Sequence, residues 1–242
     1  MTNVISQCDP PTCRRRAVIE HIARYRMAVA ATLQALPEFV TCTPKELRRL
    51  LRSLEAEGII ESQWLHHGLP CWHLTANGAI QSGLSVDRSG LLSESAKLRA
   101  YALLRFCCLS KRPRMRLTAE DFRKHFSNLY RIGMPQGYYF DSQGEGTLGL
   151  LRIDAGGRGR WDRVVHSVLD DVNQHRQQAG FSRLMHVQRF EFAIATVLPQ
   201  KADRIRESIE HKSELHNVAM RIVAMPELLP LIASTSGKDV RA

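Results

Sequence analysis

Four basic side chains recur at helical spacing in the first third of the chain, at Lys45, Arg48, Arg49 and Arg52. Positions three and four apart share one face of an α-helix, so this spacing predicts a helix with a cationic face. Such cations can bind backbone phosphates, and arginine can also donate two hydrogen bonds to a guanine edge. The spacing indicates contact with double-stranded DNA. The alternative, a charged helix face that meets only solvent, stays open.

The predicted helix has a defined start at Thr43-Pro44-Lys45-Glu46. Threonine before the first turn, proline within it and glutamate at its third position form a capping box. The helix runs to Gly58, and Thr43 joins the four basic residues as a candidate DNA contact. The opposite face is apolar and should be buried, with Leu47, Leu50, Leu51 and Leu54.

A β-hairpin is predicted directly after this helix. Residues 59–65 and 71–75 read as strands, and 66–70 as the turn between them. The turn holds His66 and His67, which could approach the negative minor groove when protonated, although a tip histidine can equally be a solvated turn residue. Two further helices are expected before the capped one, over 14–27 and 28–36.

This succession of three helices and a hairpin resembles a winged helix-turn-helix. The matching residues are 47–60, with Leu54, Glu55 and Gly58, and then 72–78, from Trp72 to Gly78. The resemblance implies a DNA-binding domain over residues 13–84. It also implies that the capped helix enters the major groove, with its basic residues toward phosphates and guanine edges.

Two aspartates close neighbouring predicted strands in the second half: Asp141 ends the strand 137–141, and Asp154 ends the strand 147–154. A helix over 161–178, a strand over 189–197, a helix over 202–211 and a strand over 218–225 follow. The order β-β-α-β-α-β predicts an α/β domain with a mixed sheet. Carboxylates that end adjacent strands are candidate ligands for Mg²⁺, or they only cap turns.

This strand order and the stretches Tyr138–Asp141 and 150–157 resemble the core of the PD-(D/E)xK nucleases. Joined to a winged helix, they resemble the replication-relaxation proteins of plasmids and integrative elements, which are related to one class of conjugative relaxases. The resemblance implies that Asp141 and an acid on the next strand hold Mg²⁺ and that a lysine assists the attacking water.

The implied nuclease triad is incomplete in this chain. Either Arg152 stands at the second acidic place, or Asp154 stands there with Gly156 where the lysine belongs. An adjacent arginine repels Mg²⁺, so a decayed nuclease is expected. Asp141 and Asp154 are catalytic and metal-binding candidates only if activity survives, and Glu145 and Glu191 could then complete a divergent site.

Composition sets the domain number and the kind of partner. The 242 residues carry a formal net charge of +10, with 44% hydrophobic side chains, which suits two folded domains and a polyanionic partner. We expect a flexible arm over 1–12, a linker over 85–95 and the α/β domain over 96–242. No apolar run approaches the roughly 20 residues of a membrane span, the N-terminus lacks a signal-peptide pattern, and the cysteines fit reduced thiols. The expectation is a cytoplasmic protein with no membrane partner.

Together these patterns predict a sequence-specific DNA-binding protein, a transcriptional regulator of a mobile genetic element such as a conjugative plasmid. It would need no cofactor and would act as a homodimer or with a partner protein of the same element. The alternative is a relaxase-like or accessory DNA-processing nuclease that uses Mg²⁺ at a transfer or replication origin. A structural adaptor that only recruits other proteins to DNA is a third possibility.

Overall fold

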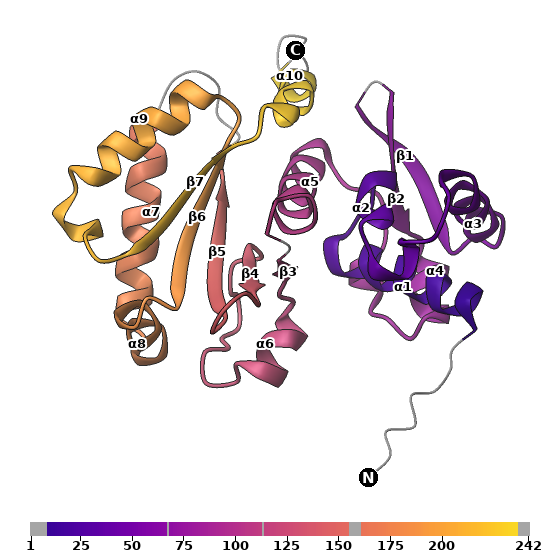
Figure 1. Cartoon of the computed structure of the whole chain (residues 1–242), viewed down its shortest axis with the longest axis horizontal. Helices are drawn as coiled ribbons and strands as arrows, with labels where there is room; N and C mark the ends of the chain where they lie inside the picture. The colour runs from indigo at the N-terminus through magenta and orange to yellow at the C-terminus, as the bar shows by residue number, and fades with distance from the viewer. Residues whose placement is uncertain (1–8, 67, 113, 155–160, 237–242) are drawn as a thin grey trace. The chain divides into compact units, whose positions relative to one another are not determined.

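The computed structural model describes residues 9–66, 68–112, 114–154 and 161–236 (Figure 1). The chain divides into two compact units, Met1–Ser93 and Glu94–Ala242. Each unit has a hydrophobic core of its own. The mixed α/β fold class expected from the sequence is confirmed.

The first unit begins with three helices, α1 (Pro10–Tyr25), α2 (Ala30–Gln34) and α3 (Pro44–Ala56), with a 3₁₀ turn at Pro37–Phe39. Helix α1 starts four residues earlier than expected, so the predicted flexible arm is wrong for residues 10–12. Proline tolerates the first helical position, where no amide donor is needed, and Pro10 begins the helix there. Arg26 ends α1 in a left-handed conformation with φ 70°.

A two-stranded antiparallel hairpin follows α3. Strands β1 (Ile60–His66) and β2 (Leu69–Leu74) pair from Ile60 opposite Leu74 to His66 opposite Leu69. Ala28, between α1 and α2, forms an isolated bridge with Trp72 of β2. The bridge ties the hairpin to the helices of the same unit.

The core of the first unit joins all of these elements. Leu47, Leu51 and Leu54 of α3 are buried, and they belong to one cluster with residues of α1, of the 3₁₀ turn and of the hairpin. Three leucines on one face fix the rotation of α3 about its axis, so the opposite face must meet solvent.

A short helix that the sequence did not predict, α4 (Ala76–Gln81), follows the hairpin. Thr75 caps it, because its Oγ1 accepts a hydrogen bond from the Gly78 amide at 2.9 Å. A Cβ atom at Gly78 would lie 2.0 Å from the Ile59 carbonyl oxygen. Only glycine lets α4 approach the start of β1 so closely.

Part of the expected linker is structured. Residues Val86–Arg88 form a 3₁₀ turn, and Arg26 of α1 donates hydrogen bonds to the carbonyls of Asp87 at 2.6 Å and Ser89 at 3.0 Å. This segment is attached to the first unit. The next helix, α5 (Glu94–Cys108), begins within the predicted linker as well.

The second unit is built on a five-stranded mixed sheet in the order β3-β4-β5-β6-β7. Strand β4 pairs antiparallel with both β3 and β5, whereas β5, β6 and β7 run parallel to one another. Its elements after α5 are β3 (Met115–Arg116), α6 (Ala119–His125), β4 (Tyr138–Asp141), β5 (Thr147–Ile153), α7 (Trp161–Arg176), α8 (Ala179–His186), β6 (Phe190–Thr196), α9 (Pro199–Glu210), β7 (Ala219–Ala224) and α10 (Leu229–Ser236).

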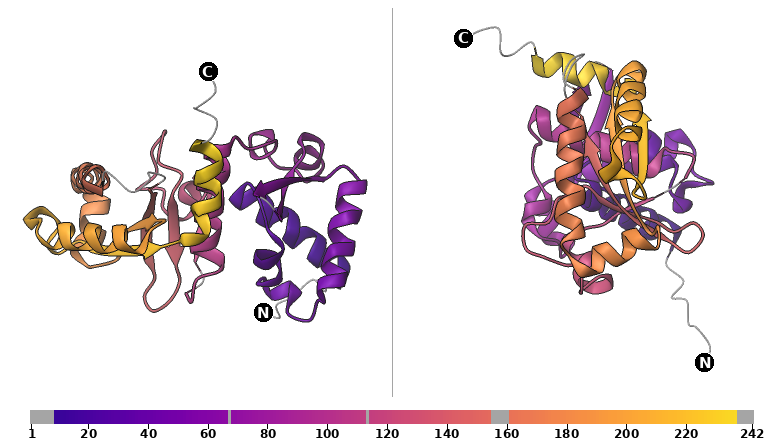
Figure 2. Two further views of the ribbon diagram at one scale, coloured as in Figure 1. Left: turned by 90° about the horizontal axis from the view of Figure 1, so that it is seen from above. Right: turned by 90° about the vertical axis from the view of Figure 1, so that its left-hand side faces the viewer.

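Helices cover this sheet on both faces. Helices α7 and α9 pack side by side on one face, and α5 packs on the other (Figures 1 and 2). Successive side chains of β4 point to opposite faces of the sheet. The Tyr138 hydroxyl contacts His175 of α7 on one face, and the ring of Tyr139 lies 4.9 Å from that of Phe106 of α5 on the other. Within the described ranges, no helix is long and apolar enough to cross a membrane.

A first prediction concerns the close approach at Gly78. We expect Gly78→Ala to lower the free energy of unfolding by about 1–3 kcal/mol, because the added methyl group must displace backbone at Ile59. Urea denaturation measures the loss. Asn77→Ala, on the exposed side of the same helix, should change stability by less than about 0.5 kcal/mol. Equal stability of the two variants would contradict the contact.

A second prediction concerns His21, a buried side chain of α1 whose Nε2 lies 3.2 Å from Thr32 Oγ1. The Thr32 hydroxyl donates to the Val29 carbonyl, so His21 must be the donor in this bond. Burial, followed by the positive charge of Arg24, lowers the pKa of His21 to about 4 from its usual 6.5. As the pH falls, the imidazole of His21 therefore becomes protonated in the unfolded chain at a higher pH than in the folded protein.

The free energy of unfolding should fall by up to about 3 kcal/mol as the pH drops from 6.5 toward 4. Above pH 6.5 His21 is neutral in both the folded and the unfolded protein, so its titration no longer changes stability. Chemical denaturation at several pH values tests it against His21→Gln, which removes the titrating group. The variant should show a shallower pH dependence over that window. Identical slopes for the two proteins would show that His21 does not titrate with unfolding.

Candidate nucleic-acid interface

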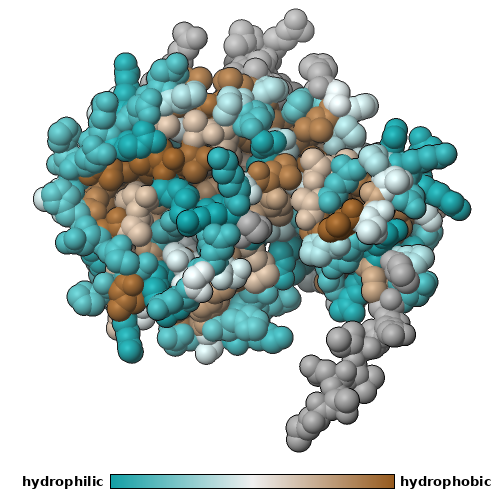
Figure 3. Space-filling view, in the orientation of Figure 1, coloured by the Kyte–Doolittle hydropathy of each residue, from teal (hydrophilic) through white to brown (hydrophobic). Residues whose placement is uncertain are grey.

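The solvent side of α3 carries the four predicted basic residues. Lys45, Arg48, Arg49 and Arg52 are all exposed, and we call them the α3 face. Figure 3 shows hydrophilic side chains over this part of the first unit. Nε of Arg48 donates a hydrogen bond to the Pro44 carbonyl at 3.1 Å. In the described parts of the chain, no ion pair engages any of the four.

The predicted capping box at the start of α3 is confirmed. The Thr43 amide donates to Glu46 Oε2 at 2.7 Å, and the Glu46 amide donates back to Thr43 Oγ1 at 3.3 Å. Hydrogen bonds from the Thr43 amide and hydroxyl lower the pKa of Glu46, which stays ionised at the positive end of the helix. Thr43 is thus occupied in fixing the helix start.

The arginines of α1 differ from those of α3 because they are engaged within the unit. Arg15 binds Glu57 with two hydrogen bonds of 2.8 and 2.5 Å, and Arg16 pairs with Glu20 at 2.7 Å. Arg14 donates to the Glu38 carbonyl at 3.1 Å. Arginine therefore has a structural role on α1, whereas the arginines of the α3 face form no ion pair within the described residues.

The tip of the hairpin holds the second group of predicted contacts. His66 is half-buried and stands opposite Leu69 at the end of β1, while His67 lies outside the described residues. Sequence reasoning missed Trp64, whose side chain is 66% exposed on the same strand. Strand alternation could have found it, since Leu65 points into the core and its neighbour must point away.

The two predicted metal-binding aspartates lie at opposite ends of the sheet. Asp141 pairs with Thr147 at the start of β5, whereas Asp154 follows the last residue of β5. Seven residues of strand separate these two levels, about 23 Å at 3.3 Å per residue. A single metal ion cannot contact both carboxylates, so the predicted shared site is wrong. The hairpin reverses the chain, which sets the end of β4 beside the beginning of β5.

Each aspartate is instead neutralised by a buried cation. Asp141 lies 3.4 Å from Nε of Arg114, and Asp154 lies 2.7 Å from Nζ of Lys201. Asp154 also accepts a hydrogen bond of 3.0 Å from the Thr196 hydroxyl. All four charged side chains are buried. Pairing with an opposite charge is the usual condition under which a protein holds a charge away from water. Both carboxylates are thus held in ion pairs within the second unit.

The other residues of the implied nuclease site are also dispersed. Arg152 forms two hydrogen bonds with Asp171 of α7, and Gly156 lies outside the described residues. Glu191 accepts from the Tyr139 hydroxyl at 2.6 Å and from Nε of Arg221 at 3.0 Å, while Glu145 is exposed. Among the described residues, no group of three or more acidic, histidine or cysteine side chains is placed to hold a metal ion.

The comparisons with known proteins add no further guide to function. No protein-family model, no curated protein and no solved structure matches the chain. Two concentrations of positive charge stand out among the described residues: the exposed α3 face in the first unit, and a group of cations around one cavity in the second. The function must be argued from these features.

A third prediction tests whether Asp154 is structural. Lys201→Met should lower the free energy of unfolding by about 3–5 kcal/mol, because it leaves the Asp154 carboxylate buried without its cation. Adding Asp154→Asn to this variant should restore part of the loss. Urea denaturation measures all three proteins, with Lys124→Met, at an exposed position, as the matched control.

A change below about 0.5 kcal/mol in Lys201→Met would mean that Asp154 is hydrated and open to other ligands. Millimolar Mg²⁺ should also leave the wild-type melting temperature unchanged, because the Asp154 carboxylate is already paired with the Lys201 ammonium group. A rise in melting temperature that Asp154→Asn abolishes would reinstate the metal site.

Proposed function

We propose that this chain is a sequence-specific protein that binds double-stranded DNA, with a winged helix as its first unit and α3 as the helix that enters the major groove. The observation that carries the proposal is the α3 face. Its four exposed cations stand on a helix whose other face is fixed in the core by three leucines. A cationic helix without acidic partners, held rigidly by its domain, has the properties that groove binding requires.

The geometry of the first unit supports this docking mode. Helix α3 has 13 residues and is about 20 Å long. An α-helix is about 10–12 Å in diameter with its side chains, which fits the width of a major groove, about 12 Å. The capping box leaves Lys45 in the first turn, the end of a recognition helix that reads bases. The hairpin follows immediately and could meet the backbone or the minor groove through the His66 end of β1.

The proposed role is transcriptional regulation on a mobile genetic element, in the cytoplasm, where the DNA is. A homodimer or a partner protein of the same element would extend the DNA site, since one recognition helix contacts only a few base pairs. The Mg²⁺-dependent nuclease alternative gains no support, because the aspartates on which it depends are about 23 Å apart and are paired with cations.

A fourth prediction tests the α3 face directly. Arg48→Ala and Arg49→Ala, made singly, should each weaken binding to the preferred DNA by about 1–3 kcal/mol if the side chain contacts guanine. An arginine that contacts only phosphate should weaken binding to all sequences and reduce the salt slope by about one. The target is the sequence that the wild-type protein enriches from a random duplex library, and titration at several salt concentrations gives the affinities.

The matched control is Arg16→Ala, which removes the same charge from an exposed position on α1. It should leave sequence preference unchanged and shift affinity only slightly. Wild-type binding in both α3 variants would remove α3 from the interface. Equal losses in all three variants would reduce the DNA contact to general charge attraction.

A further inference from the structure

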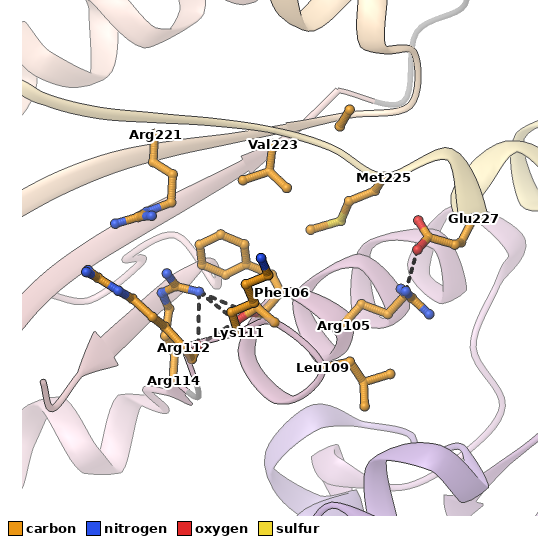
Figure 4. Close-up of a pocket in the computed structure, with 12 residues that line it drawn as sticks. Arg105, Phe106, Leu109, Lys111, Arg112, Arg114, Arg221, Val223, Met225 and Glu227 are labelled. Carbon is orange, nitrogen blue, oxygen red and sulfur yellow. Dashed lines mark hydrogen bonds and ion pairs between the residues drawn. The ribbon is translucent and has the colours of Figure 1, made fainter.

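A cavity of about 570 Å³ opens in the second unit, between the C-terminal end of α5, the segment that follows it, and β7 (Figure 4). Its volume lies in the range of small-molecule binding sites. Five cations and one carboxylate contribute to its lining, namely Arg105, Lys111, Arg112, Arg114, Arg221 and Glu227. They come from two stretches of the chain, 105–114 and 221–227, that lie more than a hundred positions apart, and none belongs to the proposed DNA interface.

Arg114 is the buried cation of this cavity, and its position is fixed on several sides. Its Nη1 donates to Ser110 Oγ at 2.9 Å and to the carbonyls of Arg112 at 3.2 Å and Phe106 at 3.3 Å. Its guanidinium lies 4.5 Å from the Phe106 ring centroid. Arg114 therefore donates to the Phe106 carbonyl near the C-terminal end of α5. The carbonyls at this end of a helix carry partial negative charge that would otherwise repel an anion.

Arg221 enters the cavity from β7. Its Nε donates to both carboxylate oxygens of Glu191, at 3.0 and 3.1 Å, which fixes the side chain. The two terminal nitrogens make no hydrogen bond within the described part of the chain. In Figure 4 the side chains of Arg112, Arg114 and Arg221 extend toward the same end of the cavity. The terminal nitrogens of Arg221 therefore face this end with donors that Glu191 does not use.

The charges do not cancel. Glu227 pairs with Arg105, Asp141 with Arg114 and Glu191 with Arg221, so three carboxylates oppose five cations and leave a surplus of two. Lys111 and Arg112 supply this surplus. Both are exposed, and the described residues offer neither of them an ion pair. A surplus of positive charge around a concave site attracts an anion.

The remaining wall of the cavity is apolar, with Phe106, Leu109, Val223 and Met225. The Arg105–Glu227 pair stands beyond it, away from the three guanidinium groups in Figure 4. A free inorganic ion would leave this wall unused. A ligand with a phosphate at one end and a flat, partly apolar body with hydrogen-bonding edges would use both parts.

We propose that this cavity binds a nucleotide, with its phosphate at Arg112, Arg114 and Arg221 and its base along the wall toward Arg105 and Glu227. Two sources supply this chemistry, a free mononucleotide and the 5′-phosphorylated end of a nucleic-acid strand. The site lies wholly within the second unit and does not depend on the proposed function of α3.

The test is calorimetric titration of the full chain with AMP, GMP, CMP and UMP, together with ribose 5-phosphate and inorganic phosphate. At least one nucleotide should bind ten or more times tighter than ribose 5-phosphate and inorganic phosphate. A 5′-phosphorylated dinucleotide and its 5′-hydroxyl form separate the two sources, because a dinucleotide is too short to span a major-groove site. Tighter binding of the phosphorylated dinucleotide than of any mononucleotide assigns the strand end, and the reverse assigns the free nucleotide.

The variant Lys111→Ala/Arg112→Ala removes the surplus charge without removing a buried pair. It should weaken nucleotide binding at least tenfold while the melting temperature stays that of the wild type. The control Lys124→Ala/Arg131→Ala makes the same change in net charge at exposed positions outside the cavity and should keep wild-type affinity. The proposal is overturned if the wild type binds no nucleotide, if nucleotides bind no tighter than inorganic phosphate, or if the two double variants lose affinity equally.

Discussion

A carboxylate that is buried in this protein must have a cation beside it, and this requirement divides the basic residues of the chain into two groups. Arg114, Lys201 and Arg221 neutralise acids inside the second unit, and Arg15 does the same at the surface of the first. A net charge of +10 leaves many cations beyond those that the acids require. Where these excess cations lie together, as on the α3 face, their positive charge is not balanced by acids of the protein and attracts anions from solution.

Much of the fold could be predicted from local patterns. The capping box gave the start of α3, and alternation and helical spacing gave β1, β2 and most elements of the second unit to within a few residues. The elements that the sequence patterns missed are short: β3 has two residues, α4 has six, and α8 and α10 have eight each. Pro10 and Pro11 suggested a loop because proline breaks a helix interior, although it suits a helix start.

The sites were harder to predict because they depend on pairing between distant segments. The aspartates looked adjacent since both end strands, but an antiparallel hairpin brings the end of one strand to the beginning of the next. The α3 face could be predicted because four residues on one helix suffice to form it. The cavity beside α5 could not, since Arg114 and Arg221 meet only after the sheet has formed, and no spacing in the sequence relates them.

Strand β7 forms an outer edge of the five-stranded sheet, and every residue in it is half-exposed. Such an edge presents unpaired backbone groups to which a strand of another molecule could add, and a charged side chain directed inward is one natural protection against this. Arg221 sits in the middle of β7 and pairs inward with Glu191. We expect this charge to disfavour edge-to-edge pairing with another molecule, because an apolar residue at this position would leave β7 without any charged side chain.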